Sequence, residues 1–242
     1  MIPKEPRGSF RADHFATITE IMTPPAPIVL SVDAGTTQGH KNAFSVVQAW
    51  RVGARRFYLL DQFREQCDYC DLRDAVRRFR KRYRPAAILI ERAANGIALI
   101  SDLSRKHRDL VIPIEPDGRS KSARLRAHAE IIIAKSIHLT ADAPWRDEFV
   151  AEFVEFGSNR FTDQVDATTQ MLHLADELAR LEPRPAPGGG VLVGNSVKHQ
   201  RTIVPSSTQS TPGLIAGRRL SDGQPMTGRP STVPLQYLKS KF

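Results

Sequence analysis

The stretch of residues 27–37, PIVLSVDAGTT, constrains the fold of this chain more than any other. After its proline comes a run made up mainly of aliphatic and β-branched residues, the composition of a strand buried in a sheet. The run ends in the carboxylate of Asp33, and Gly35 allows a sharp turn and leaves space beside that carboxylate. A side chain at the end of a buried strand is held rigidly, as a metal ligand must be. Asp33 is therefore a candidate metal ligand at the edge of a sheet.

Two later stretches bring further acids to the same place. Glu91 closes an apolar strand predicted over residues 86–91, and Asp163 and Asp166 open a predicted final helix. Because these two are three residues apart, both can face one side of that helix. Carboxylates from separate elements suit Mg²⁺ or Mn²⁺, and two such ions can activate water and stabilise the leaving oxygen in phosphodiester cleavage. The sequence predicts one catalytic, metal-binding cluster of Asp33, Glu91, Asp163 and Asp166 that cuts nucleic acid.

Each acid also has a purely structural interpretation. Asp33 could be a turn residue or a helix cap, Glu91 a solvated strand end, and Asp163 an ordinary N-cap. The catalytic interpretation depends on all of them occurring at matching positions of one architecture.

The order of the predicted elements indicates an α/β fold. The strands predicted over residues 28–33, 43–52 and 56–63 form an antiparallel meander, since the last two are joined by a tight turn. Helices then alternate with strands, which gives a mixed β-sheet with helices on both faces, the ribonuclease H-like plan. The remaining predicted helices span residues 72–84, 95–106, 120–135, 144–156 and 163–181, and the remaining strands 86–91, 110–114 and 137–140.

Composition divides the chain into three parts. Residues 1–26 are polar and contain proline, residues 27–182 carry the periodic apolar pattern of a folded domain, the expected nuclease, and residues 183–242 are rich in Pro, Gly and Ser. The last part should be disordered, because it lacks periodic apolar content. Of the net charge of +9, seven charges lie in residues 184–242, where eight Lys or Arg accompany one acid. A basic tail suits polyanion binding or simply aids solubility, and charge alone does not decide between the two.

Other features exclude some classes of protein. No apolar run approaches the roughly 20 residues that cross a bilayer, and residues 1–7 lack the apolar centre of a secretory signal. We therefore expect an intracellular protein with no membrane partner. Cys67 and Cys70 form the single C-x-x-C pair. A structural zinc site usually needs a second pair of ligands, so two reduced thiols in a loop are expected.

Residues 28–182 resemble the C-terminal nuclease domain of the large terminase subunit of tailed bacteriophages. The matching motifs are Val32-Asp33-Ala34-Gly35, ILIERAANG at 88–96, KSARLRA at 121–127, Phe149-x-x-Glu152-Phe153, and FTDQVDA at 161–167. The resemblance implies an endonuclease that cuts concatemeric double-stranded DNA during genome packaging in the bacterial host cytoplasm. It also implies two Mg²⁺ or Mn²⁺ ions held by the four acids. In that family an acid or histidine often precedes the position of Asp163, where this chain has Thr162.

The resemblance implies partners as well. Terminase large subunits carry an N-terminal ATPase motor with a phosphate loop ending in Gly-Lys-Ser/Thr, and this sequence has no such loop. Residues 1–26 resemble the linker that follows the motor. We therefore expect a nuclease part without its motor, with the portal, the small subunit and a separate ATPase chain as possible partners. Lys121, Arg124 and Arg126 are candidate phosphate contacts or else a solvated helix face.

Three alternatives stay open. Residues 33–37 also resemble the phosphate-binding turn of sugar kinases and actin-like ATPases, but those proteins need a second, duplicated domain. A junction resolvase or transposase of the ribonuclease H-like class would use similar acids and differ in its preference for substrate structure. A DNA- or portal-binding module that had lost activity would keep the fold and cut nothing.

Overall fold

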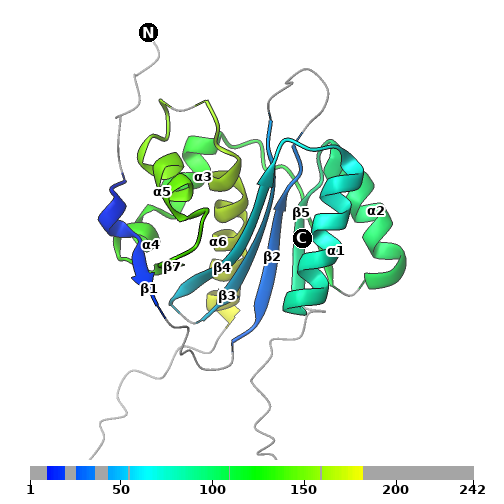
Figure 1. The fold of residues 1–242 in the computed structure, drawn as a ribbon, viewed down its shortest axis with the longest axis horizontal. Helices are drawn as coiled ribbons and strands as arrows, with labels where there is room; N and C mark the ends of the chain where they lie inside the picture. The colour runs from blue at the N-terminus through cyan, green and yellow to red at the C-terminus, as the bar shows by residue number, and fades with distance from the viewer. Residues whose placement is uncertain are drawn as a thin grey trace, which may run out of the picture. The chain divides into compact units, whose positions relative to one another are not determined.

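The structure is a computed structural model that describes residues 10–19, 26–35, 43–53, 55–108, 110–158 and 160–181. A seven-stranded sheet runs through these residues in the order β1-β7-β4-β3-β2-β5-β6 (Figure 1). Its strands are β1 (Ala16–Ile18), β2 (Ile28–Asp33), β3 (Ser45–Val52), β4 (Phe57–Glu65), β5 (Ala87–Glu91), β6 (Val111–Ile114) and β7 (Ile137–Thr140).

The pairing of the strands places the two strand-borne acids at one edge of the sheet. β2, β3 and β4 form the predicted antiparallel meander, whereas β5 pairs with β2 in parallel, with Val32 beside Ile90. Asp33 and Glu91 follow these two residues, and parallel neighbours end at the same edge. The predicted α/β fold with a mixed sheet is confirmed.

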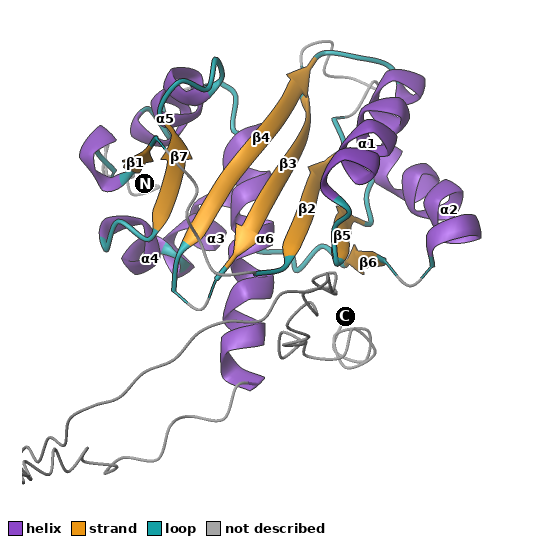
Figure 2. Ribbon diagram, turned by 60° about the horizontal axis from the view of Figure 1, so that its bottom comes forward, coloured by secondary structure: helices purple, strands orange, loops and turns teal. Residues whose placement is uncertain are grey.

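Helices cover both faces of this sheet (Figure 2). α1 and α2 pack on one face against alternate residues of β2, β3 and β5. α6 crosses the opposite face, where it packs with α5 and the N-terminal segment. The helices are α1 (Tyr69–Tyr83), α2 (Asn95–His107), α3 (Lys121–Ala127), α4 (Ala129–Ile133), α5 (Arg146–Val154) and α6 (Asp163–Leu181), with the short 3-10 helix η1 (Ala12–His14).

Local chemistry sets the limits of α1. The Asp68 side chain accepts a hydrogen bond from the Asp71 N–H at 3.0 Å and so caps the first turn, which is a common role for Asp. The helix ends at Tyr83, and its C-cap Arg84 has a left-handed backbone (φ 45°) and precedes Pro85. Because the residue before a proline is disfavoured in the helical region, the sequence correctly predicted a stop here.

The prediction of one helix over residues 120–135 was wrong. The structure divides this segment into α3 and α4 at His128, whose φ of −112° and ψ of 11° are not helical. The His128 side chain is buried, with Nδ1 3.1 Å from an oxygen of Asp176 on α6. The helix is thus interrupted at a residue whose polar side chain is buried. The spacing of apolar residues in the sequence gives no sign of such an interruption.

Residues 10–19 add a strand that the sequence did not predict. β1 pairs in parallel with β7, and the rings of Phe10 and Phe15 are buried against α5. The folded part of the chain therefore includes a segment before residue 27. The proposed linker character of residues 1–26 stays a prediction, and the tail predicted at 183–242 lies outside the described residues. None of the described helices has the length and apolar character needed to cross a lipid bilayer.

Candidate active site

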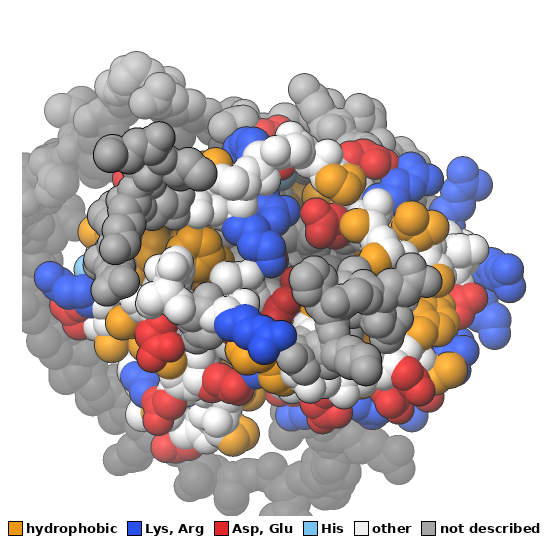
Figure 3. Space-filling model, turned by 90° about the horizontal axis from the view of Figure 1, so that it is seen from above, with side chains coloured by type: hydrophobic (Ala, Val, Ile, Leu, Met, Phe, Trp, Pro, Cys, Tyr) orange, Lys and Arg blue, Asp and Glu red, His pale blue; other side chains and the backbone are white. Residues whose placement is uncertain are grey.

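A cavity of about 550 Å³ opens at the edge where β2 and β5 end. Figure 3 looks onto this edge and shows acidic and basic side chains close together near its centre. All four acids predicted from the sequence line the cavity: Asp33 from β2, Glu91 from β5, and Asp163 and Asp166 from the first turn of α6. The tertiary structure thus brings together residues up to 133 positions apart.

The turn after Asp33 is held by close backbone packing. A Cβ atom at Gly35 would lie 2.7 Å from the carbonyl oxygen of Phe44, nearer than real Cβ contacts come. Glycine is therefore required for the strand to pass this close to its neighbour. The Asn95 side chain donates a hydrogen bond of 2.7 Å to the Gly35 carbonyl. This bond joins the start of α2 to the turn that carries Asp33.

A second glycine fixes the position of Glu91. A Cβ atom at Gly96 would lie 2.1 Å from the Glu91 carbonyl oxygen. The first turn of α2 therefore packs directly on the backbone of the last residue of β5. Only glycine permits this approach, which holds the end of β5 against the helix that follows it.

α6 is anchored to the sheet beneath the cavity. Ser31 is fully buried in β2, and its hydroxyl donates to the Ala167 carbonyl at 2.6 Å. The same hydroxyl oxygen accepts a hydrogen bond from the Gln170 amide at 3.0 Å. These contacts hold α6 close to the strand that presents Asp33.

The N-terminus of α6 is capped by a residue of another helix. Glu152 of α5 is 2% exposed, and one of its oxygens accepts the backbone N–H groups of Gln164 and Val165 at 2.7 and 3.1 Å. Thr162 precedes the helix, but its hydroxyl accepts instead from Lys121 at 2.7 Å. Glu152 thereby satisfies N–H groups that a helix leaves unpaired in its first turn.

A buried polar network extends from this cap into the sheet. Gln164 donates to the second oxygen of Glu152 at 2.7 Å and accepts from Gln62 at 2.6 Å. Gln62 in turn accepts from Gln48 at 2.8 Å, and Gln48 accepts from the Trp50 indole at 2.9 Å. Since buried polar groups are costly when unpaired, this chain of hydrogen bonds specifies the relative positions of β3, β4, α5 and α6.

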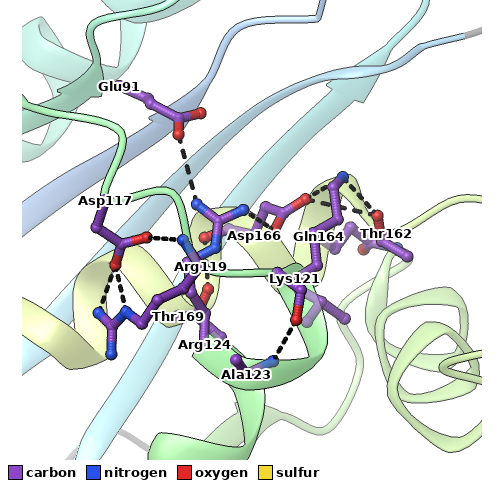
Figure 4. Close-up of polar contacts among 12 residues, drawn as sticks. Glu91, Asp117, Arg119, Lys121, Ala123, Arg124, Thr162, Gln164, Asp166 and Thr169 are labelled. Carbon is purple, nitrogen blue, oxygen red and sulfur yellow. Dashed lines mark hydrogen bonds and ion pairs between the residues drawn. The ribbon is translucent and has the colours of Figure 1, made fainter. Parts of the chain in front are cut away.

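Two basic side chains of α3 project among the acids (Figure 4). The Lys121 ammonium group contacts one oxygen of Asp166. Arg124 lies 2.9 Å from the other oxygen of Asp166 and 3.4 Å from an oxygen of Glu91. Both oxygens of Asp166 therefore have cationic partners within the protein.

The carboxylates of Asp33 and Asp163 lie close to other carboxylates. Burial is the first cause that raises the pKa of Asp33 well above its usual value, and the charges of Asp166 and Asp163 raise it further. Burial also raises the pKa of Asp163, although Lys121 and a backbone N–H from Phe44 oppose this. The pKa of Lys121 is raised because its acidic neighbours outweigh its burial. The charged forms of Asp33 and Asp163 are therefore costly here, and an added positive charge would offset that cost.

The donor set fits a hard divalent cation. Oδ2 of Asp163 is buried and has no hydrogen-bond partner among the described residues. Carboxylate oxygens are the ligands that Mg²⁺ and Mn²⁺ prefer. In the described part of the chain, no group of three His, Cys, Asp or Glu side chains is close enough together to hold one metal ion. The acids share a cavity, and Asp33, Glu91 and Asp163 are those whose oxygens are least occupied by Lys or Arg.

The structure extends the sequence-based set of site residues. Lys121 and Arg124 line the cavity, as does Arg160. Arg126 is exposed and is not among the described residues that line the cavity. Sequence reasoning assigned no role to Glu152. Its position between Phe149 and Phe153, on the apolar face of a predicted helix, could have revealed it. A charged residue there is buried and needs partners.

Two of three comparisons with known proteins found matches to this chain. A family model described as the terminase RNaseH-like domain matches residues 30–175. The large terminase of a thermophilic bacteriophage is 13% identical, with a TM-score of 0.51 over 68% of this chain and 44% of that chain. The large terminase nuclease of the thermophilic phage G20c with bound magnesium is 12% identical, with a TM-score of 0.51 over 68% of this chain and 95% of that chain. No curated protein matches the sequence.

At such low identity the structural matches show a shared fold. The chain spans less than half the length of the first of these two proteins, the large terminase, and it covers nearly all of the G20c nuclease.

Proposed function

This chain belongs to the family of terminase ribonuclease H-like domains, and on that premise we propose that it is a divalent-metal-dependent endonuclease. Its substrate is double-stranded DNA, cut during phage genome packaging in the host cytoplasm. The observation that carries the proposal is the convergence of four carboxylates on one cavity, two from adjacent parallel strands and two from the first turn of α6. The G20c nuclease, with the same fold, is described with bound magnesium.

The proposed roles differ among the four acids. Asp33, Glu91 and Asp163 would hold Mg²⁺ or Mn²⁺, in a site for two ions. The buried, unpartnered oxygen of Asp163 favours this residue over Asp166. When bound, such ions would polarise the scissile phosphodiester and make water a stronger nucleophile at neutral pH. Asp166 would instead orient the two basic side chains that contact it.

Lys121 and Arg124 are proposed to bind the DNA backbone. Both lie in the cavity wall and are partly exposed, so a phosphate that enters can reach them. Arg124 offers a planar group suited to two phosphate oxygens, and Lys121 a compact charge. Their contacts with Asp166 hold them in place beforehand, which lowers the ordering cost of binding.

The remaining partners follow from the family. Large terminases combine a nuclease with a motor, so a separate ATPase chain, the portal and the small subunit are proposed partners. A junction resolvase or transposase activity is the main enzymatic alternative. It predicts a strong preference for branched or end-specific DNA, whereas a packaging nuclease cuts linear and circular duplexes with little sequence preference.

The test is incubation of supercoiled plasmid with the purified chain in Mn²⁺, in Mg²⁺ or in chelator. We expect cutting only with metal, and its loss in Asp33→Ala and Glu91→Ala. Asp142→Ala is the matched control, because Asp142 is an exposed acid outside the cavity. Undiminished cutting by both site variants would reject the assignment. A folded parent protein that binds DNA and never cuts it would favour the inactive binding module.

A further inference from the structure

The helices on the sheet face opposite α6 carry a concentrated positive charge. Residues 69–84, which form α1 and its C-cap, contain seven Lys or Arg and two Asp, and residues 105–108 at the end of α2 contain three Lys or Arg and no acid. Five of these cations are exposed and form no ion pair with any acid that the structure describes. We call them the α1–α2 basic face: Arg78, Lys81, Arg84, Arg105 and Lys106.

The two helices present these charges together. α1 and α2 pack side by side through a shared apolar cluster (Figures 1 and 2), and the Tyr69 hydroxyl donates to Asp102 at 2.8 Å. The pKa of His107 is lowered, first by burial and then by Arg80 of α1 and Lys106 of α2. The last turn of α1, which carries Arg80, and the end of α2 therefore lie close together.

Folding alone does not account for so much charge. Cations near a helix C-terminus interact favourably with the helix dipole. However, Arg78 and Lys81 are three residues apart on α1, and Arg84 follows at its C-cap. Like charges at this spacing repel and destabilise a helix. An arrangement that costs the isolated domain stability is explained if an anion binds there.

The chemistry of this face selects a phosphate backbone over a protein. The cores of protein interfaces are built from aromatic and apolar side chains with few charges. On α1 and α2, Ile97 is the one large hydrophobic side chain in the described structure that is well exposed, at 55%. Long basic side chains without acidic partners are instead the groups that contact DNA phosphates. We propose that the α1–α2 basic face binds the backbone of duplex DNA outside the cutting site, an inference that takes its ligand from the proposed function.

The geometry sets the length of DNA needed. β4 runs parallel to β2, so α1, which follows β4, begins near the active-site edge and leads away from it. Its 15 residues span roughly 22 Å at about 1.5 Å per residue. That length corresponds to about six or seven base pairs at about 3.4 Å each. A duplex of forty base pairs is therefore long enough to lie at the cavity and along the basic face at once.

The experiment measures binding of a fluorescent 40-base-pair duplex in chelator as a function of NaCl, so that cutting plays no part. The test variant is Arg78→Gln, Lys81→Gln and Arg84→Gln combined. The control variant removes the same charge elsewhere, as Arg11→Gln, Arg56→Gln and Lys135→Gln combined, all exposed. Each lost phosphate contact should reduce the slope of log K against log[NaCl] by about 0.9. We expect the test variant to lose about two to three in slope and roughly 10- to 100-fold in affinity near 0.1 M salt.

A second readout separates this proposal from the nuclease assignment. That readout is plasmid cutting in Mn²⁺, which tests the nuclease assignment alone. The thermal unfolding midpoint of the test variant should be no lower than that of its parent, because the charges removed repel one another. An unchanged slope with the 40-base-pair duplex overturns the proposal, and the face then becomes a candidate surface for an acidic protein. A changed slope in a protein that never cuts DNA would support this proposal and reject the nuclease.

Discussion

Glu152 and Gln164 form a two-point contact at the N-terminus of α6. One carboxylate oxygen of Glu152 accepts the Gln164 backbone N–H at 2.7 Å, and the other accepts its side-chain amide at 2.7 Å. Gln164 lies between the two acids that α6 contributes to the cavity. Glu152 is not among the described residues that line the cavity. It nevertheless sets the orientation of the turn that carries Asp163.

Glu152→Gln should weaken metal binding without unfolding the domain. The new amide would face the Gln164 amide, two donors without an acceptor, and the first turn of α6 would shift. We expect roughly 10- to 100-fold weaker Mn²⁺ binding by calorimetry, the usual effect of losing a supporting partner. The double variant Glu152→Gln with Gln164→Glu restores one donor and one acceptor and should recover most of the affinity. Equal Mn²⁺ affinity in the single variant and the parent would show that Glu152 has no positioning role.

Asp163→Asn and Asp166→Asn should have separable effects. Asp163 has the unpartnered oxygen, so its variant should lose Mn²⁺ binding while it still binds duplex DNA in chelator. Asp166 contacts Lys121 and Arg124 with both oxygens, so its variant should change DNA affinity by several-fold and alter Mn²⁺ affinity less. Calorimetry and fluorescence anisotropy measure the two quantities. The opposite pattern would exchange the roles that we assign.

Asp33→Asn should stabilise the metal-free protein at neutral pH. Folding raises the pKa of Asp33, so its contribution to stability is fully present below the unfolded value of about 3.9 and is lost as the pH rises through the folded pKa. Asparagine has no charge to bury. The variant's gain in unfolding free energy should be small near pH 4 and grow toward pH 8 in urea titrations with chelator. Asp142→Asn is the control, and Mg²⁺ should stabilise the parent more than Asp33→Asn.

Gly96→Ala should displace Glu91. The added Cβ would meet the Glu91 carbonyl oxygen at 2.1 Å, so the start of α2 or the end of β5 must move. Overpacking of this kind costs about 1–3 kcal/mol. We expect a lower denaturation midpoint together with weaker Mn²⁺ binding. Ala98→Ser, at an exposed position of the same helix, should change neither quantity.

Phe15→Ala tests whether the N-terminal segment belongs to the fold. The Phe15 ring is 4% exposed and lies 5.2 Å from the Phe153 ring, centroid to centroid. Removal of a buried phenylalanine side chain costs roughly 3–5 kcal/mol. Denaturant unfolding should show a loss of this size, whereas Thr19→Ala, at an exposed position, should have little effect. A loss below about 1 kcal/mol would mean that the segment packs weakly.

Much of the fold and of the candidate site could be read from local pattern. The apolar run before Asp33 predicted β2, Pro85 predicted the end of α1, and apolar spacing predicted a helix over residues 163–181, which the structure shows as α6. The resemblance to terminase nucleases selected the four acids, and all of them line one cavity. The limits of the strands and helices depend on neighbours within a few positions in the chain, so periodicity and turn chemistry reveal them.

Only the tertiary structure decided which partner each polar side chain has. The break at His128, the strand β1 and the cap supplied by Glu152 depend on contacts between elements far apart in the chain. Ser31 and Ala167, joined by one hydrogen bond, are 136 positions apart. Likewise, the sequence placed Asp163 and Asp166 on one side of a helix, but the two basic side chains of α3 engage Asp166 and leave an oxygen of Asp163 without a hydrogen-bond partner in the described structure. Such choices arise from packing and charge in three dimensions, which a local pattern does not encode.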